Sequence, residues 1–341
     1  MVIGCKIVKI RIIINSKLSC TFCLNQFYYF FTFDVLINGR MKKKIVAFGE
    51  VVWDILPNEK VLGGTPSNLV FRCNSLGEQG FLLSRVGDDD YGLDALDKLK
   101  ELNISDVNIQ IDSEFPTGTV HITFEDEYDP RYIVTPDVAF DHIEFSAEAL
   151  KLVRDADCLV YGLLPQRFGI SKNTLRELLK ESPDSLHFFD LKLFEHFFNV
   201  KVVERLLESS NIIRIKEKEI DFLSGELGLN NDNLNEFSSE LSKKYNIDLI
   251  LVTRGQKGVF AFHNKKGAFY DLGYKIDVVD NIGSGMAFSA GFLHYYLNGK
   301  SIQRALNFGN AAGALNTTKR GATSFFNKND VLSFMKSTPQ N

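Results

Sequence analysis

The sequence predicts an α/β fold in which a mostly parallel sheet is flanked by helices on both faces. From residue 150 onward, short apolar runs alternate with stretches of helical periodicity, which is typical of parallel strands joined by helical crossovers. Earlier, the alternating segments 117–124 and 132–135 predict an antiparallel pair of strands. The 341 residues are 45% hydrophobic, which provides enough apolar material for a large core.

Charge and cysteine content narrow the possible functions. The chain carries 39 basic and 43 acidic residues, so it has no basic surplus for nucleic acid, and a small molecule is the better partner. Its five cysteines form no disulfide framework, and the lone Cys20-x-x-Cys23 lacks the second pair of a zinc site. We therefore expect free thiols in a reducing compartment, the cytoplasm.

The first 40 residues differ in composition from the rest, because they are rich in aromatic residues and isoleucine and contain no acid before Asp34. They lack the uninterrupted apolar stretch of a secretory signal and the roughly 18 apolar residues of a membrane span. We expect no membrane partner. Since a clean strand at 45–48 follows Met41, we expect one folded domain at 41–335, and an atypical extension at 1–40 that is either disordered or a start-site artefact.

The segment after the first strand carries candidate ligand-binding groups. Asp54 ends an apolar run, where its carboxylate would face a ligand or cap a turn. Gly63 and Gly64 allow close approach of the backbone, and we expect Asn68 to open a helix that ends at residue 76. The Asn68 amide would bind a ligand or act as the helix N-cap.

A strand is predicted at 82–86 and a helix at 93–102. Three acidic residues, 88–90, lie between them. They could hold a metal ion, but they more simply complement the dipole of the helix that follows.

The second half of the chain supplies the repeated strand and helix pattern. The strands are predicted at 158–161, 186–189, 212–215, 249–252 and 259–262, with helices near 171–181, 200–209, 217–224 and 234–245. Ligands of such sheets bind at the carboxyl ends of the strands. Asp54, Asp190, Glu219, Thr253 and the turn at Gly283 all follow strands, so they could converge there.

The stretch 280–291 is the most distinctive in the chain. An apolar approach at 276–279, interpreted as a strand, feeds a Gly283-Ser284-Gly285 turn, and a helix is predicted at 287–297. Bare main-chain N–H groups at a helix start form an anion cradle, although such a turn is also common in plain strand-to-helix connections. Met286, at the mouth of the helix, can neither accept a proton nor carry charge.

Two further segments fit a nucleotide site. The second glycine turn, 253–258, follows a strand and is either part of a binding site or an ordinary hairpin. The small apolar helix at 307–315 would let a flat group such as adenine lie against it, and close helix packing explains it equally well.

Together these motifs resemble the PfkB family of sugar kinases, which has the ribokinase-like fold, over roughly residues 44–322. The motifs that carry the resemblance are Gly63-Gly64-Thr65-Pro66-Ser67-Asn68, Val86-Gly87-Asp88-Asp89 to Gly92, Thr117-Gly118, Thr253-Arg254-Gly255-x-x-Gly258 and Asp280-x-x-Gly283-Ser284-Gly285. Gly49-Glu50 to Trp53-Asp54, with Gln166-Arg167, looks most like the fructokinase branch.

The resemblance implies transfer of the γ-phosphoryl group of ATP, with Mg²⁺, to a hydroxyl of a sugar, most simply a ketohexose such as fructose. It implies a small β-sheet lid from segments near 51–62 and 117–135, which could also pair two copies as a homodimer. The implied sugar-binding residues are Asp54, Gly63, Gly64, Asn68, Gln166 and Arg167. The implied phosphoryl-binding turn is Gly283, Ser284 and Gly285, and the implied nucleotide-binding residues are Lys192, Lys216, Glu219, Thr253, Gly255, Gly258, Asp280, Asn307, Asn310 and Gly313.

The sequence departs from the family pattern where the chemistry is done. The family's D-T-x-G-A-G-D has its catalytic base at the position of Met286 and its threonine at Asn281. Its D-x-N-x-R is found here as Asp190-Leu191-Lys192-Leu193-Phe194. Its N-x-x-E, which organises Mg²⁺ through water, is found as Lys216-Glu217-Lys218-Glu219 and keeps only the glutamate.

These departures leave three hypotheses. The chain is a sugar kinase whose base is replaced by another carboxylate such as Asp89 or by water, a silent sugar- or nucleotide-binding protein on a kinase scaffold, or a scaffold without a ligand. Losing a general base costs about 10² to 10⁴ in rate, so slow turnover would survive. Lys192 and Lys216 would stand in for Mg²⁺ charge near the phosphates or be solvated loop lysines.

Overall fold

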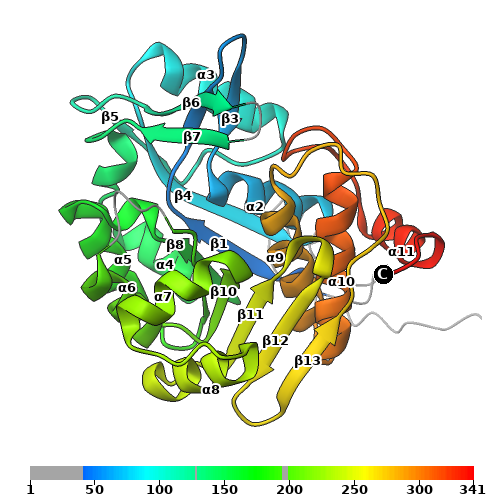
Figure 1. Ribbon diagram of the computed structural model, residues 1–341. Coiled ribbons are helices and arrows are strands. Elements are labelled where there is room, and N and C mark those ends of the chain that lie inside the picture. The colour runs from blue at the N-terminus through cyan, green and yellow to red at the C-terminus, as the bar shows by residue number, and fades with distance from the viewer. Residues whose placement is uncertain (1–40, 127–128, 194–198) are drawn as a thin grey trace, which may run out of the picture. The chain divides into compact units, whose positions relative to one another are not determined.

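The computed structural model describes residues 41–126, 129–193 and 199–341. The predicted extension, 1–40, lies outside these residues. Within the described part, nine strands form one large sheet and four form a small second sheet. The predicted fold class, an α/β fold with a mostly parallel sheet and a small second sheet, is confirmed (Figure 1).

The large sheet contains, in spatial order, β13 (Gly267–Asp271), β12 (Val259–His263), β11 (Leu249–Thr253), β10 (Ile212–Lys216), β9 (Leu186–Asp190), β8 (Cys158–Gly162), β1 (Lys44–Phe48), β4 (Gln79–Gly87) and β5 (Ile109–Asp112). The small sheet contains β3 (Lys60–Gly63), β2 (Val52–Ile55), β6 (Gly118–Asp126) and β7 (Asp129–Val134). The helices of the described residues are α2 (Thr65–Ser75), α3 (Asp90–Glu101), α4 (Ala147–Arg154), α5 (Gly169–Glu181), α6 (Val200–Glu208), α7 (Ile220–Leu227), α8 (Leu234–Tyr245), α9 (Ser284–Tyr296), α10 (Ile302–Thr317) and α11 (Lys328–Ser337).

Strand direction sets where a ligand can bind. Neighbouring strands from β11 across to β5 run parallel, whereas β12 and β13 are antiparallel additions at one edge. In the small sheet, β6 and β7 form the predicted antiparallel pair. The parallel strands therefore present their carboxyl ends at one side of the sheet, where the loops leading to the helices gather.

Alternation along the strands sorts the core into two layers. In β1, Ile45 and Ala47 belong to a core cluster shared with α2, α9 and α10, whereas Val46 and Phe48 belong to a second cluster shared with α5, α6 and α8. Because successive side chains of a strand point to opposite faces, each face of the buried sheet needs its own helices. Figure 1 shows α4 to α8 grouped apart from α2, α9 and α10.

Helix α2 begins earlier than the sequence indicates. Its N-cap is Gly64, with φ of +106°, and Pro66 occupies the first turn. Proline fits there because the N–H that it lacks has no intrahelical acceptor. Asn68 therefore lies inside the helix, and its interpretation as the N-cap was wrong.

The apolar approach at 276–279 is not a strand. It runs as irregular backbone with Val279 62% exposed, and the N–H groups of Val279 and Asp280 donate to the Thr317 carbonyl at 2.8 and 3.1 Å. The carbonyl at the end of α10 thus takes the hydrogen bonds that a sheet would otherwise have provided. The β-branched pattern was a misleading signal at this place.

The acidic residues before α3 serve the helix. Asp89 is the N-cap of α3, accepting from Gly92 N at 2.7 Å, and it also accepts from the main chain and hydroxyl of Thr117. Among the described residues, no group of three His, Cys, Asp or Glu side chains is placed to hold a metal ion. The simpler of the two interpretations of residues 88–90 fits this arrangement.

A fully buried arginine ties α2 to the end of the chain. The Arg72 guanidinium donates to Asn316 Oδ1 at 3.0 Å and to the Ser324 carbonyl at 2.8 Å, and lies 3.5 Å from the centre of the Phe326 ring. These carbonyl groups and the face of the Phe326 ring stabilise the buried cation and replace the water that would otherwise solvate it. Helix α2 and the segment after α10 are thereby fixed to each other.

Two cysteines fall in the described residues. Cys73 and Cys158 are buried free thiols, and burial raises the pKa of both. Cys5, Cys20 and Cys23 lie outside the described residues. Among the described helices, none combines the length and the apolar character needed to cross a membrane.

Candidate functional site

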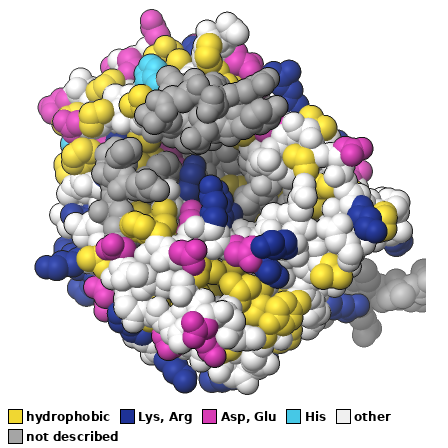
Figure 2. All heavy atoms as spheres, viewed as in Figure 1, with side chains coloured by type: hydrophobic (Ala, Val, Ile, Leu, Met, Phe, Trp, Pro, Cys, Tyr) yellow, Lys and Arg dark blue, Asp and Glu magenta, His cyan; other side chains and the backbone are white. Residues whose placement is uncertain are grey.

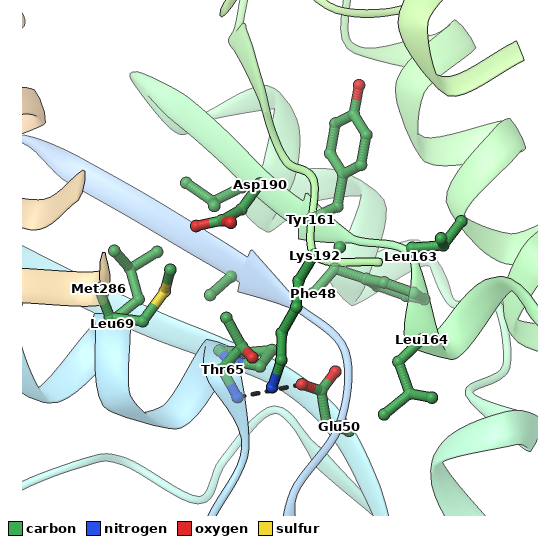
Figure 3. A pocket seen from close by; sticks show the side chains of 14 residues that line it. Phe48, Glu50, Thr65, Leu69, Tyr161, Leu163, Leu164, Asp190, Lys192 and Met286 are labelled. Carbon is green, nitrogen blue, oxygen red and sulfur yellow. Dashed lines mark hydrogen bonds between the residues drawn. The ribbon is translucent and has the colours of Figure 1, made fainter. Parts of the chain in front are cut away.

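A small cavity lies where β1, β8 and β9 end and where α2 and α9 begin. Its volume is about 20 Å³, room for roughly one water molecule. The polar groups in its lining are Glu50, Thr65, Asp190 and Lys192, and Met286 contributes from the first turn of α9 (Figure 3). These side chains come from segments far apart in the sequence, as the parallel topology predicts.

A larger groove of about 700 Å³ lies beyond the ends of β10, β11 and β12. Its floor combines polar residues near the first turn of α9 with small and apolar residues of α10 and the 273–278 segment. The lining includes Lys216, Lys218, Thr253, Gly255, Gly258, Ile276, Asn281, Ser284, Gly285, Asn310, Gly313 and Ala314. A long ligand with one anionic end and one flat apolar end suits this lining.

The glycine turn has the geometry of an anion cradle. Gly283 is the N-cap of α9 with φ of +79°, and a Cβ there would lie 2.6 Å from the Ala322 Cα atom. The N–H groups of Gly285 and Met286 fall in the first turn, where a helix offers no acceptor of its own. Asp280 shapes this turn, because its oxygens accept from Ile282 N and Gly321 N at 2.9 and 2.8 Å.

We expect Gly283→Ala to remove nucleotide binding and to lower stability beyond the cost of its backbone conformation. Gly299 is the matched control, because it has φ of +69° but a Cβ added there would meet no atom within 4 Å. Gly299→Ala should cost about 1–2 kcal/mol, the cost of a left-handed conformation for alanine, and leave binding intact. Urea unfolding and ATP titration of both variants measure this. Equal losses in the two variants would contradict a role for close packing at Gly283.

Below the turn lies a buried ion pair. Arg214, in β10, donates to Asp190 Oδ1 at 2.5 Å, and their side chains are 3% and 2% exposed. A Cβ at Gly285 would collide with the Arg214 guanidinium, so the arginine packs directly against the start of α9. The Ser289 hydroxyl, 3.5 Å from Asp190 Oδ2, adds a further contact from the same helix.

Met286, predicted to occupy the position of the catalytic base, lies in the first turn of α9. The side chain is buried, 7% exposed, and reaches the small cavity beside Leu69 (Figure 3). Glu50 and Lys192 lie towards the other end of that cavity, with the Lys192 side chain directed at Glu50. A thioether accepts no proton at neutral pH, so the position contributes no general base.

The residues predicted to bind the sugar come from the small sheet and from α2. Asp54 is in β2, and a Cβ at Gly63 would come within 2.5 Å of its carboxylate, so the glycine admits this side chain. Burial raises the pKa of the Asp54 carboxyl to about 6, and the positive charge of Lys192 opposes that rise. Asn68 Oδ1 is buried without a hydrogen-bond partner among the described residues, which leaves an acceptor available for a ligand.

Asp54→Asn should stabilise the protein at neutral pH while removing a ligand contact. The native carboxyl binds its proton more tightly than the unfolded one, so wild-type stability falls as the pH rises from about 4 to 6. The variant has no carboxyl group at this position, so its stability does not fall in this way. Its free energy of unfolding should therefore equal that of the wild type below about pH 4 and exceed it by up to about 3 kcal/mol above pH 6. Urea unfolding at several pH values measures it. A pH-independent difference would contradict the raised pKa.

Gln166 and Arg167, also predicted to bind the sugar, are buried near η1 (Ala139–His142). Arg167 donates to both oxygens of Asp141, at 2.7 and 2.6 Å, and to the Thr135 carbonyl. Gln166 is 2% exposed, and its Nε2 has no partner among the described residues. Neither is among the described residues that line the two cavities.

The predicted nucleotide residues fall into three groups. Those that line the groove are Lys216, Thr253, Gly255, Gly258, Asn310 and Gly313, whereas Lys192 lines the small cavity. The residues outside both linings are Glu219, Asp280 and Asn307. Glu219 instead accepts from the main chain of Leu193 and Lys216, at 3.1 and 2.9 Å, and so fixes two loops that border the site.

Two charged residues of the site were not singled out from the sequence. Glu50 is 5% exposed, accepts from Thr65 N at 3.0 Å, and burial raises the pKa of its carboxyl. Arg214 is the other. Each stands inside an apolar run, Gly-Glu-Val-Val-Trp or Ile-Ile-Arg-Ile. A charged residue within an apolar run is buried together with that run, and a buried charge needs an oppositely charged partner or a ligand. A lone charge in an apolar run is therefore a signal that could have identified both residues.

Known proteins resemble this chain in sequence. The profile described as pfkB family carbohydrate kinase matches residues 39–329. A probable fructokinase-2 of Arabidopsis thaliana is 25% identical over 332 residues, covering 88% of this chain and 98% of that protein.

Two solved structures share the fold. The fructokinase of Xylella fastidiosa with bound ATP gives a TM-score of 0.75 at 17% identity and covers 87% of this chain and 99% of its own. A putative ribokinase II of E. coli in complex with ATP and Mg²⁺ gives a TM-score of 0.73 at 17% identity, with the same coverage of both chains.

Proposed function

Because the chain belongs to the pfkB family of carbohydrate kinases, we propose that it is a fructokinase-like sugar kinase with impaired catalysis. It transfers the γ-phosphoryl group of ATP to a hydroxyl of a sugar, and it does so slowly because Met286 occupies the position of the base. The fructokinase names of its relatives support a ketohexose such as fructose as the acceptor.

One observation carries the proposal. Consecutive residues at the start of α9 face different cavities: Gly285 lines the large groove and Met286 lines the small one. A phosphoryl group held by the N–H groups of this turn would therefore lie between a nucleotide in the groove and a sugar bound on the side of the small cavity. Transfer between two bound molecules requires this arrangement, because the reacting atoms must be brought into line.

The residues present fit a nucleotide. The glycine turn offers bare N–H groups to the phosphates, and the part of the groove lined by Gly313 and Ala314 would accept a flat base. For Mg²⁺, the Glu219 oxygens each have one main-chain donor and keep one lone pair for a coordinated water. The ion would arrive on the phosphates and supply charge that stabilises the transferring group.

The chain's own groups bind and orient the reactants. Asp54 and Asn68 accept hydrogen bonds from sugar hydroxyls, and the turn at 283–285 neutralises phosphoryl charge. The small sheet, which carries Asp54, would act as the lid that limits the access of water. Proton removal is the missing function, since no carboxylate stands at residue 286. Asp89, which sequence reasoning offered as a substitute, is held by Gly92 and Thr117.

The alternative function is a silent sugar- or nucleotide-binding protein, and the buried Met286 side chain favours it. A coupled ADP-release assay with fructose and other hexoses, run beside calorimetry with ATP and with fructose, separates the two. Sugar-dependent ADP release supports the kinase. Binding without release supports the silent protein, and absence of both binding and release contradicts both.

We further propose a homodimer formed through the small sheet, in the cytoplasm. Ile133 of β7 is 58% exposed, so one face of the sheet has an apolar side chain to cover. Light scattering of the wild type and of an Ile133→Lys variant tests this. A monomeric wild type would contradict it.

A further inference from the structure

Cations gather at the floor of the site, where the two cavities approach each other. Lys192 lines the small cavity, and Lys216 and Lys218 line the groove. Figure 2 shows Lys and Arg side chains in the hollow at the centre of this face. Where a metal ion balances the negative charge of the phosphates, fewer cationic side chains are needed. The presence of this lysine cluster therefore requires an explanation.

Lys216 is the central member of the cluster. It ends β10 and is half-buried, and it shares the groove with Ser284 and Gly285 of the anion-binding turn. Burial lowers the pKa of its ammonium group, and the nearby charge of Arg214 adds to this. The negative charge of Glu219 opposes this fall in pKa, whereas Lys192 and Lys218 lower the pKa further. An anion placed among these groups would relieve their mutual repulsion.

The neighbouring carboxylates are already engaged. Asp190 receives Arg214, and the two Glu219 oxygens receive main-chain N–H groups. Glu217 accepts from Arg254 and Lys257, at 3.1 and 3.2 Å. The main-chain N–H groups leave the charge of Glu219 in place, but the cations outnumber the three carboxylates. These cations are Arg214, Lys216, Lys218, Arg254 and Lys257. The groove near the turn therefore keeps a positive potential, which is suited to a ligand with several negative charges.

We propose that Lys216, supported by Lys192 and Lys218, supplies the charge that holds the nucleotide polyphosphate, so that ATP binds to this chain without a divalent cation. The inference rests on the proposed nucleotide site and deepens it by assigning the charge partner of the phosphates. A lysine ammonium is a compact charge that can meet a phosphate oxygen directly. Metal then remains useful for the transfer itself but not for binding.

Calorimetric titration with ATP, in EDTA and in excess Mg²⁺, tests the proposal. The wild type should bind ATP with affinities within about threefold of each other in the two buffers. Lys216→Met should weaken binding in EDTA by at least about tenfold, since truncating one partner of a buried charge pair is costly. The loss should be smaller in Mg²⁺, because the ion replaces the missing charge.

Matched variants test whether the effect is specific to residue 216 and whether it depends on the positive charge there. Lys265→Met removes one positive charge at an exposed position in the turn between β12 and β13 and should leave both affinities unchanged. Lys216→Arg should keep most of the affinity in EDTA. Titration with adenosine, which lacks phosphates, should show no difference between wild type and Lys216→Met.

The outcomes distinguish this inference from the proposed function. Wild-type binding that appears only with Mg²⁺ overturns the inference and leaves the nucleotide site standing. Failure to bind ATP in either buffer overturns both. If the wild type binds in EDTA but Lys216→Met binds as tightly, the assignment of Lys216 is wrong.

Discussion

Replacing Met286 by aspartate is expected to raise sugar-dependent ADP release about 10²- to 10⁴-fold, the usual contribution of a general base. The residue lies in the first turn of α9 and already reaches the small cavity. A carboxylate there would stand next to the N–H groups of the turn and could take the proton of a sugar hydroxyl. Initial rates with fructose and ATP measure the gain.

Met286→Asn is the control for this gain of activity. Asparagine has the size and polarity of aspartate but accepts no proton, so it should remain as slow as the wild type. Equal rates of the two variants would contradict the view that a missing base limits the reaction. In that event the other departures, at Lys192 and Lys216, would have to be reverted together with Met286.

Removing Arg214 should produce the largest loss of stability. Arg214→Met leaves the Asp190 carboxylate buried and unpaired, which we expect to lower the free energy of unfolding by about 3–5 kcal/mol. The variant also removes the guanidinium that packs against Gly285 at the start of α9. Urea unfolding of the variant and wild type at neutral pH gives the difference.

Two comparisons test the explanation. Arg154→Met breaks a surface ion pair, since the side chains of Arg154 and Glu181 are 52% and 38% exposed. It should lower the free energy of unfolding by less than about 1 kcal/mol. Adding Asp190→Asn to Arg214→Met should recover part of the loss, because the stranded charge disappears. A double variant less stable than Arg214→Met would show that the loss comes from packing rather than from charge.

The strands of the sheet could largely be predicted because their residues are apolar on both faces. The runs at 158–161 and 249–252 each start one of the observed strands. The strands β5 and β13 were not predicted, since each is short and mixes apolar residues with polar ones or glycine. Local composition there does not distinguish a sheet edge from a loop.

The candidate site could be predicted where it depends on backbone geometry. The glycine turn at 283–285 and the turn at 253–258 line one groove together, although only the second of them follows a strand. Side-chain partnerships were beyond the sequence. The pairing of Arg214 with Asp190 arises because these two residues are direct partners in the register of β10 and β9, and the sequence does not reveal that register.

The contacts of Arg72 have a consequence for synthesis on the ribosome. Helix α2 is translated early, yet the groups that receive its guanidinium lie 244–254 residues further along the chain. During synthesis, this part of the core cannot form until the last segment of the chain has left the exit tunnel. In prematurely terminated products, the Arg72 guanidinium would lie next to apolar side chains without its hydrogen-bond acceptors. Quality control in the cell should therefore recognise fragments that end before residue 316.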